Sequence, residues 1–405
     1  MKDKKVNNER RRLLVNLGKA GVLVGAGTVF NITPFASARA QSGAADGVSS
    51  DTIKIGMTAG ISGPIAFGSQ QFAGYMQRYF DKVNAAGGVN GRKLQLTVLD
   101  DGGKGDVALR NAQRFVQEDK TFAVTSIGTP TAAAIIDYLT KQNVPFLFPV
   151  AYNTELVTAR RPNTFALYQS YDGQVASVTK WAYGKLGNGS AVIIRASLPS
   201  FDSVAESAGK AVVAAGGTVA GTINSAYNQP EWSSAVIRLK QLKPDYLILM
   251  TTGPDMGRFY KEVIQQNAFP AKATLGISPL GDQAFIDSAG PGIPDNKIFA
   301  AIPGTVVQTA PEAKEVRDLW PEQTLGIFGL EGAASGGMMV EAFRRVGPSL
   351  TRPALFDLLA SKFGPYKLPF TATAKSAPDN LLIRSIGIAT VKGGVFAAAT
   401  EEFIE

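Results

Sequence analysis

The 405-residue chain contains no histidine and no cysteine. Without histidine, a Ser-His-Asp or Cys-His nucleophile system and an imidazole metal ligand are both excluded. Without cysteine, the chain can form no disulfide, no thiolate nucleophile and no zinc finger. An enzyme would have to rely on carboxylates, Lys, Ser or Tyr, so the commonest catalytic sites are excluded.

Basic residues outnumber acidic ones, 41 to 33, which gives a formal net charge of +8. That balance by itself would suit nucleic acid or an anionic membrane. However, eight of the basic residues and two of the acidic ones lie within residues 1–40. The rest of the chain is left with 33 basic and 31 acidic residues, a net charge of +2. We therefore expect no nucleic-acid partner.

Residues 1–40 have the layout of a cleaved export signal. A basic stretch ends in Arg10-Arg11-Arg12-Leu13-Leu14, and its Arg-Arg-x-Leu-Leu core resembles a twin-arginine signal. A charge-free run over residues 20–38 follows, and Ala38-Arg39-Ala40 offers small residues at the alternate positions that a signal peptidase needs. We expect cleavage before Gln41 and a location in the periplasm.

The alternative is an uncleaved membrane anchor, because the run over 20–38 is about long enough to cross a bilayer. Three glycines and Pro34 interrupt that run and argue against the anchor. A lipid anchor is excluded because its attachment needs a cysteine at the cleavage site. No other stretch approaches transmembrane length, so we expect the mature protein to be a soluble monomer.

The 365 residues after the signal are too many for one simple core and suit two domains. Short β-branched runs alternate with longer helical patterns, which predicts βαβ units and a mainly parallel sheet. We expect strands over 53–57, 94–99, 122–126, 144–148, 190–195, 218–223, 246–250 and 273–277. We expect helices over 69–84, 107–118, 131–141, 175–186, 204–215, 232–242 and 256–266. Toward the end we expect helices over 315–346 and 352–362, then a hairpin of 381–390 with 395–399.

Several landmarks of the mature chain carry a family resemblance. They begin with Ile53-Lys54-Ile55-Gly56 and Ile61-Ser62-Gly63-Pro64. The most specific is the Gly-Gly-x-Asn-Gly-Arg turn over 87–92, followed by Asp100-Asp101, and Phe328-Gly329-Leu330-Glu331-Gly332 supports it. With these landmarks the chain resembles the substrate-binding proteins of ABC transporters, of the branched-chain amino-acid (Leu/Ile/Val-binding) type.

The resemblance implies the α/β fold of a two-lobed type I periplasmic binding protein. Each lobe would be a mainly parallel sheet flanked by helices, and three crossover hinge strands would join the two lobes into a clamshell. We expect the first lobe to comprise 51–170 and 304–375, and the second 171–303 and 376–405. The family binds one small ligand between the lobes and delivers it to the permease of the transporter.

Three loops of the first lobe are candidates for ligand contacts, since ligands of open α/β sheets gather beyond the carboxyl ends of the strands. In Gly128-Thr129-Pro130-Thr131, Thr129 suits the N-cap and Pro130 the first helical position, so the helix start could bind a carboxylate. The resemblance places Thr129 and Thr131 at the family's carboxylate-binding hydroxyls. The alternative is that Thr129 only caps its helix.

Further contacts of the first lobe are implied by the resemblance. It carries over Ala151 and Tyr152 as ligand contacts and Phe67 as an aromatic wall of the cleft. Tyr152 could instead be a surface aromatic residue.

The second lobe departs from the pattern of the amino-acid binders. Phe201 stands at the usual Tyr place, and Thr252 and Ser278 stand where those members have the Tyr and Glu that read the ligand's ammonium. A buried ammonium without a carboxylate partner would be costly, although Asp255 or Asp282 could substitute. We therefore expect a carboxylate ligand without an α-ammonium, aromatic or aliphatic, held between Phe67, Tyr152 and Phe201.

Arg195, at the end of a strand, could add a cation to the ligand site. It could instead be a solvated surface residue.

Other functions fit the sequence less well. Residues 103–108 match G-x-G-x-x-A, a dinucleotide-binding pattern, but the match is loose in a chain with 43 glycines. We expect no enzymatic activity, no cofactor and no metal. The alternatives to solute transport are binding of a branched-chain or other amino acid, and service as a ligand-sensing receptor for a signalling partner.

Overall fold

The computed structural model describes residues 46–63, 65–151, 161–226 and 229–404. The described residues all belong to one compact unit. The export signal expected over 1–40 lies outside the described residues and stays a prediction.

The first of two sheets has five strands, all parallel, in the order β2-β1-β3-β4-β5. Strand β1, which lies between β2 and β3, is buried on both faces along most of its length, as a parallel sheet covered by helices requires. The strands are β1 (Thr52–Ala59), β2 (Lys93–Asp100), β3 (Ala123–Ile127), β4 (Phe146–Leu147) and β5 (Thr164–Phe165).

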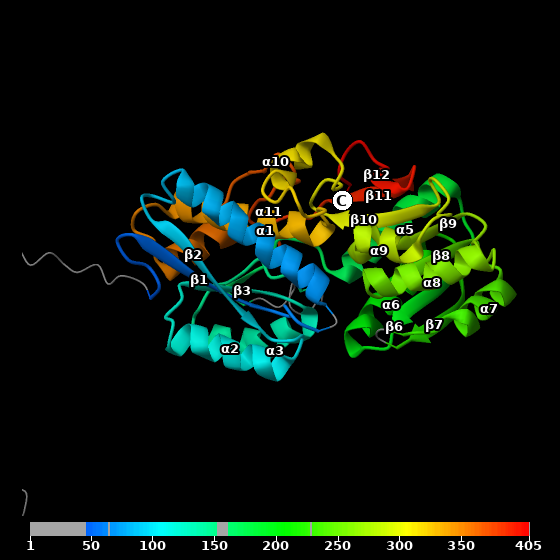
Figure 1. Cartoon of the computed structure of the whole chain (residues 1–405), viewed down its shortest axis with the longest axis horizontal. Helices are drawn as coiled ribbons and strands as arrows, with labels where there is room; N and C mark the ends of the chain where they lie inside the picture. The colour runs from blue at the N-terminus through cyan, green and yellow to red at the C-terminus, as the bar shows by residue number, and fades with distance from the viewer. Residues whose placement is uncertain (1–45, 64, 152–160, 227–228, 405) are drawn as a thin grey trace, which may run out of the picture. The chain divides into compact units, whose positions relative to one another are not determined.

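Helices cover both faces of this sheet (Figure 1). On one side α1 (Ala66–Ala85) packs against α11 (Ile327–Val346), and on the other α2 (Gly105–Gln117) packs against α3 (Thr129–Lys141). The α1–α11 contact is close: a Cβ on Gly332 would lie 2.3 Å from the carbonyl oxygen of Phe72. We call this sheet with its helices the first lobe.

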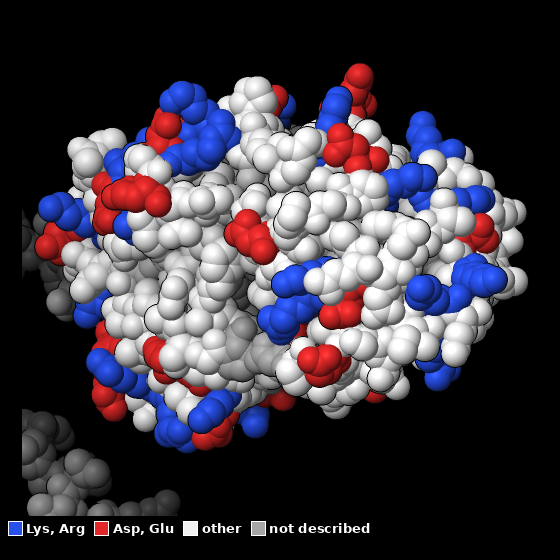
Figure 2. Space-filling model, turned by 45° about the vertical axis from the view of Figure 1, so that its right-hand side comes forward, with Lys and Arg blue, Asp and Glu red and all other residues white. Residues whose placement is uncertain are grey.

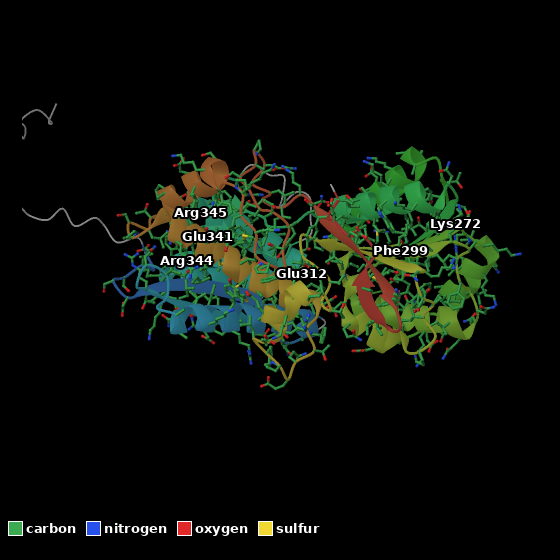
Figure 3. All side chains as sticks on the ribbon, turned by 90° about the horizontal axis from the view of Figure 1, so that it is seen from above. Lys272, Phe299, Glu312, Glu341, Arg344 and Arg345 are labelled. Carbon is green, nitrogen blue, oxygen red and sulfur yellow. The ribbon has the colours of Figure 1, made fainter. Side chains whose placement is uncertain are left out.

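The C-terminal end of α11 is stabilised by contacts of Arg345. Arg345 pairs with Glu341 at 2.7 Å and lies over the rings of Phe363 and Tyr366. Figure 3 shows Glu341, Arg344 and Arg345 together on this helix. Arg344 and Arg345 stand in the last turn, where positive charge suits the helix dipole.

The second sheet has seven strands in the order β12-β11-β10-β9-β8-β6-β7. Five of them run parallel, and a C-terminal hairpin adds two antiparallel strands beside β10. The strands are β6 (Ser190–Ala196), β7 (Thr218–Ser225), β8 (Tyr246–Met250), β9 (Ala273–Gly276), β10 (Ile298–Pro303), β11 (Ile386–Lys392) and β12 (Val395–Ala398).

The helices of the second sheet also pack in groups (Figure 1). Helix α5 packs against α6, while α8 packs against both α9 and α7. Apolar side chains of these helices and of the strands form one buried cluster, in which the rings of Trp181 and Phe299 meet edge to face at 5.0 Å. We call this sheet the second lobe, with α5 (Tyr171–Leu186), α6 (Asp202–Ala214), α7 (Ser233–Leu242), α8 (Gly253–Gln265) and α9 (Gln283–Ala289).

Three chain connections between the lobes are hydrogen-bonded to one another. The amide of Leu382 donates to the carbonyl of Ala166 at 3.0 Å, so the first and third connections pair. The amide of Gly304 donates to Ser385 at 3.1 Å, and that of Ala372 donates to Gly304 at 2.9 Å. Backbone hydrogen bonds thus link the crossings to one another. The residue boundaries expected for the lobes remain a prediction.

The predicted alternation of strands and helices up to residue 277 is confirmed, with ends that differ by a few residues. The single helix predicted over 315–346 is wrong. Helix α10 (Lys314–Arg317) ends early, and α11 begins only at Ile327, because Pro321 lacks an amide donor and blocks a continuous helix. The predicted strand over 381–390 begins only at Ile386. Helix α9 and strands β5 and β10 were not predicted.

Candidate functional site

A cavity of about 380 Å³ lies between the two lobes, at the carboxyl ends of the parallel strands. Its wall comes from the segments that follow β2, β3, β6, β8 and β9 and from the first turns of α1, α5 and α11. This is where open α/β sheets bind ligands. The fold therefore places one pocket where both lobes contribute to its lining.

Aromatic rings form much of the pocket wall. Phe67 and Phe328 come from the first lobe, and Tyr171 and Phe201 from the second. The rings of Tyr171 and Phe201 lie 5.9 Å apart and are tilted by 33°. Phe67 is 43% exposed, a large apolar side chain at the mouth of a water-accessible cavity. Such a surface suits a ligand with an apolar body.

The start of α3 differs from the prediction in one respect. Thr129 is not the N-cap: Gly128 is the cap, and Thr129 and Pro130 are the first two residues of the helix. Gly128 has φ 114°, a conformation that L-residues avoid, and its amide donates to the carbonyl of Val150 at 2.9 Å. Gly128, Thr129, Pro130 and Thr131 all line the pocket.

The hydroxyl of Thr131 is used inside the helix start. It donates to the carbonyl of Gly128 at 2.8 Å, and the side chain is fully buried. Helix α3 has no acidic residue in its first turn. Its positive end therefore faces the pocket without a carboxylate of its own, which favours an anion there.

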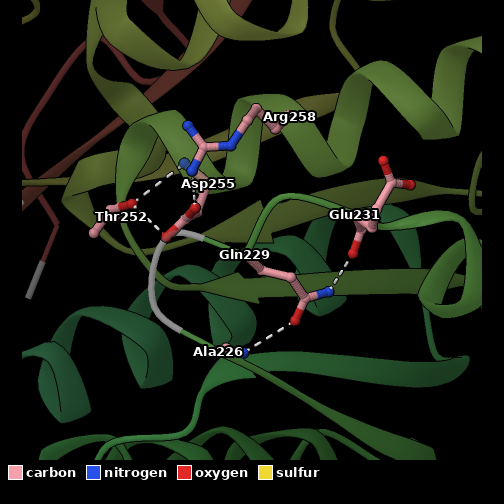
Figure 4. Close-up of polar contacts among 6 residues, drawn as sticks. All are labelled: Ala226, Gln229, Glu231, Thr252, Asp255 and Arg258. Atoms are coloured by element: carbon pink, nitrogen blue, oxygen red, sulfur yellow. Dashed lines mark hydrogen bonds and ion pairs between the residues drawn. The ribbon is translucent and has the colours of Figure 1, made fainter.

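The start of α8 is built differently (Figure 4). Thr252 caps the helix, since its Oγ1 accepts from the amide of Asp255 at 3.2 Å. The same hydroxyl donates to Asp255 Oδ2 at 2.9 Å, and Arg258 pairs with the other oxygen of this buried carboxylate. Thr252 lines the pocket, but its hydroxyl is engaged in the cap.

The helix starts that line the pocket differ between the two lobes in whether they carry an acidic residue. In the first lobe, α1, α3 and α11 have no acidic residue in the first turn and no side-chain cap of their own. In the second lobe, the four helices that begin at the pocket each start with an acidic residue: Asp172 in α5, Asp202 in α6, Asp255 in α8 and Asp282 at the cap of α9. At the helix starts that line the pocket, acidic residues in the first turn or at the cap are thus present in the second lobe only.

Four of the residues predicted to contact the ligand are not placed in the pocket lining. Ser278 is buried, and its amide donates to Gln174 Oε1 at 3.0 Å. Arg195 pairs with Asp202 and donates to Asn224 Oδ1 at 2.9 Å. Ala151 packs in the cluster between α2 and α3, and Tyr152 lies outside the described residues. The other five, Phe67, Thr129, Thr131, Phe201 and Thr252, line the pocket, and their contact with a ligand stays a prediction.

Sequence reasoning missed Tyr171 and Phe328 as pocket residues. Phe328 opens the landmark over 328–332, but only the tertiary packing of α11 on α1 brings it to the pocket. Asp282, considered above as a partner for an ammonium, does line the pocket. Its oxygens accept from the amides of Ala284 and Ile327, each at 2.9 Å, and burial raises the pKa of this carboxyl to about 6.

The glycine-rich turn after β2 has a structural explanation. Asp100 accepts from the amides of Ser62 and Gly102, and Asp101 accepts from Gly103 at 2.8 Å and from Thr58 Oγ1. The two carboxylates thus stabilise the turn that carries Gly102 and Gly103 to the pocket wall.

The surface of the protein carries charges of both signs, scattered over both lobes on the face seen in Figure 2. Among the described residues, no helix is both long enough and apolar enough to cross a bilayer.

Curated relatives match only part of the chain. A Leu/Ile/Val-binding protein homolog of Brucella melitensis is 32% identical over 31% of this chain and 34% of its own length. The Leu/Ile/Val-binding protein of Escherichia coli is 24% identical over 52% of this chain and 58% of its own length. The matched stretches thus cover less than two thirds of either relative.

Solved structures match nearly the whole fold. A fatty acid ABC transporter substrate-binding protein from Thermomonospora curvata has a TM-score of 0.77 at 18% identity, over 89% of this chain and 94% of its own. An R. palustris solute-binding protein in complex with benzoate scores 0.75 at 19%, over 86% and 95%. A branched-chain amino-acid transporter protein from Thermus thermophilus with bound valine scores 0.79 at 17%, over 88% and 97%. At these identities the likeness shows the fold alone.

The family itself follows from the sequence model of periplasmic binding proteins, which matches residues 52–395. That range contains both sheets almost in full and all the residues described above for the pocket. The chain belongs to the periplasmic binding protein family, whose solute receptors have the two-lobed α/β fold found here.

Proposed function

We propose that this protein is an extracytoplasmic receptor that binds a small carboxylic acid with an apolar body and delivers it to an ABC-type permease. The observation that carries the proposal is the composition of the pocket. Aromatic rings from both lobes face the cavity, and the loop over 128–131 lines it with the start of α3, which has no acidic residue in its first turn. Such a site offers shape to the body of the ligand and backbone donors to its carboxylate.

The carboxylate of the ligand is expected at residues 128–131. Backbone amides at a helix start bind anions without any basic side chain, and the positive end of the dipole adds to the attraction. No Lys or Arg is found among the described residues that line the pocket. An anion in this pocket is therefore expected to bind at α3.

The same pocket offers little to stabilise an α-ammonium group. The one Asp or Glu among the described lining residues is Asp282, and both of its oxygens already accept backbone amides. A desolvated ammonium without a close carboxylate is costly. This supports an acid without an α-ammonium, in line with the benzoate complex of the R. palustris neighbour.

The test compares acids that differ only in the ammonium. Calorimetric titrations of the mature protein with isocaproate against leucine, and with hydrocinnamate against phenylalanine, isolate that group at constant shape. Benzoate is added as a short aromatic acid. We expect tighter binding of the acid without the ammonium in each pair, and a higher melting temperature in its presence.

The second candidate is an amino-acid receptor. It is favoured by the names of the curated relatives and by the valine bound in the Thermus thermophilus neighbour. Tighter binding of leucine than of isocaproate would establish it and reject the first candidate. Transport is distinguished from sensing by uptake of the labelled ligand in cells that lack the receptor, since only a transport role makes uptake depend on it.

Export by the twin-arginine route belongs to the same proposal. Lysine does not reproduce the planar guanidinium of arginine. Replacing both Arg10 and Arg11 by Lys should leave the precursor unprocessed in cell fractions, whereas normal export would favour a general secretory signal.

A further inference from the structure

The carboxylate of Asp282 joins the starts of two helices that belong to different lobes. Its Oδ1 accepts from the amide of Ala284 in α9 at 2.9 Å, and its Oδ2 accepts from the amide of Ile327 in α11 at 2.9 Å. The side chain is 1% exposed. One buried carboxylate therefore caps both helices, and α11 has no side-chain cap from its own segment.

The first turn of α11 is held on its other side by α1. The amide of Gly326 donates to Gln71 Oε1 at 2.7 Å, and Gln71 Nε2 donates to the carbonyl of Thr324 at 3.3 Å. A Cβ on Gly326 would lie 2.6 Å from Asp282 Oδ2 and 2.8 Å from Gln71 Oε1. Glycine is needed here so that both side chains can reach the backbone.

The residues that follow divide between the two lobes. Ile327 is buried in the apolar cluster of the second lobe, whereas Leu330 is buried in that of the first. Phe328 packs against both clusters and lines the pocket. A shift of the first turn of α11 would therefore move a wall of the pocket.

We propose that Asp282 is a positioning residue for ligand binding: by capping α9 and α11 together it holds Phe328 in place as a pocket wall. The inference deepens the function proposed above and rests on it for the identity of the ligand. Asp282 acts here through Phe328 and not by contact with a charged group of the ligand. The geometry supports this role because both carboxylate oxygens are aimed at backbone amides of the two helices.

The first test needs no ligand. Hydrogen exchange of the mature protein is compared between the wild type, Asp282→Asn and Asp287→Asn. Asp287 lies exposed on the same helix and has no bond to α11, so its variant removes an equal charge without the cap. We expect faster exchange of the amides at 326–330 in Asp282→Asn alone, with peptides of α7 unchanged. Unchanged exchange at 326–330 would overturn the proposal.

The second test measures whether the effects of substitutions at Asp282 and Phe328 on the affinity for benzoate are coupled, at a temperature well below the melting temperature. Asp282→Asn should weaken benzoate binding roughly fivefold, about the effect of one lost capping bond. Phe328→Leu as a single substitution should also weaken benzoate binding. In the double variant the two effects should not multiply, because Phe328 has already lost its position. Phe201→Leu, in the second lobe, should combine with Asp282→Asn multiplicatively.

The outcomes separate this inference from the function on which it rests. Multiplicative effects for both aromatic residues would mean that Asp282 does not act through Phe328, and would overturn the proposal. A selective loss of leucine over isocaproate in Asp282→Asn would make it a reader of the ammonium and overturn the proposal. If benzoate does not bind the wild type, the choice of ligand fails, and the exchange comparison still decides the role of Asp282.

Discussion

The two lobes meet at one pocket but approach it with opposite electrostatics. Helices α5, α6, α8 and α9 of the second lobe each begin with an acidic side chain, whereas α1, α3 and α11 of the first lobe begin without one. Helix α3 and helix α8 make the contrast plain, since both carry proline near the start and both line the pocket. Only α8 brings its own carboxylate, Asp255.

The difference assigns unequal roles to the lobes. The positive end of α8 is already compensated by Asp255, which also pairs with Arg258. The positive end of α3 keeps its preference for an anion from outside the chain. The first lobe would then supply most of the charge recognition, and the second lobe would supply shape through Tyr171 and Phe201.

The largest effect is expected when α3 is made to resemble α8. Thr129→Asp places a carboxylate in the first turn of α3, at the proposed anion site, where it repels the ligand. We expect affinity for benzoate to fall a hundredfold or more, about 3 kcal/mol. Thr129→Asn is the control, since it has the same shape without the charge. Similar affinity of the two variants in calorimetry would reject α3 as the anion site.

A second prediction concerns the pH dependence of stability contributed by Asp282. Burial, with a smaller effect from Asp287, raises the pKa of Asp282 from 3.8 to about 6 in the folded state. The folded protein then binds the proton more tightly than the unfolded chain. The resulting stability is fully present below about pH 4 and is lost as the pH rises through about 6, at most about 3 kcal/mol.

Urea unfolding between pH 4 and pH 7 measures this effect. The difference in unfolding free energy between the wild type and Asp282→Asn should change over that interval, because the variant cannot titrate. Asp287→Asn should keep most of the wild-type pH dependence, displaced slightly toward lower pH because Asp287 contributes to the raised pKa of Asp282. A constant difference between wild type and Asp282→Asn would mean that the carboxyl keeps its ordinary pKa.

A smaller effect compares the two threonines. Thr252→Ala removes the cap of α8 and should cost about 1 kcal/mol of unfolding free energy, with little change in affinity. Thr129→Ala removes no N-cap and should weaken benzoate binding a few-fold. Denaturant unfolding and calorimetry on both variants check this. A larger loss of affinity in Thr252→Ala than in Thr129→Ala would mean that the second lobe, and not the first, binds the anion.

The smallest effect is expected at Arg195. Its guanidinium pairs with Asp202 and donates to Asn224, away from the pocket lining. Arg195→Gln should change affinity for benzoate by less than about twofold, within the range of surface substitutions. A much larger loss of affinity would mean that Arg195 contacts the anion of the ligand. The second lobe would then also contribute to charge recognition.

Much of the fold was predictable because local patterns determine it. The periodicity of apolar residues predicted α1 and β1, and Pro130 predicted the start of α3 to within one residue. The cap was misplaced from Gly128 to Thr129 because a positive φ cannot be read from a residue name. Asp282 and Ile327 stand 45 positions apart and meet only through packing, so no local pattern indicated that contact. The pocket was therefore predicted in part, chiefly in the first lobe.

The crossings of the chain also determine when the first lobe can become complete during synthesis. Its sheet begins with β1 at residue 52, but the helix that covers α1 is α11, at residues 327–346. A nascent chain that lacks α11 leaves the apolar face of α1 without its cover, so the lobe cannot fold stably until most of the protein has left the ribosome. Contacts so distant in sequence slow folding and prolong exposure of apolar surface. The first lobe thus depends on the last quarter of the chain.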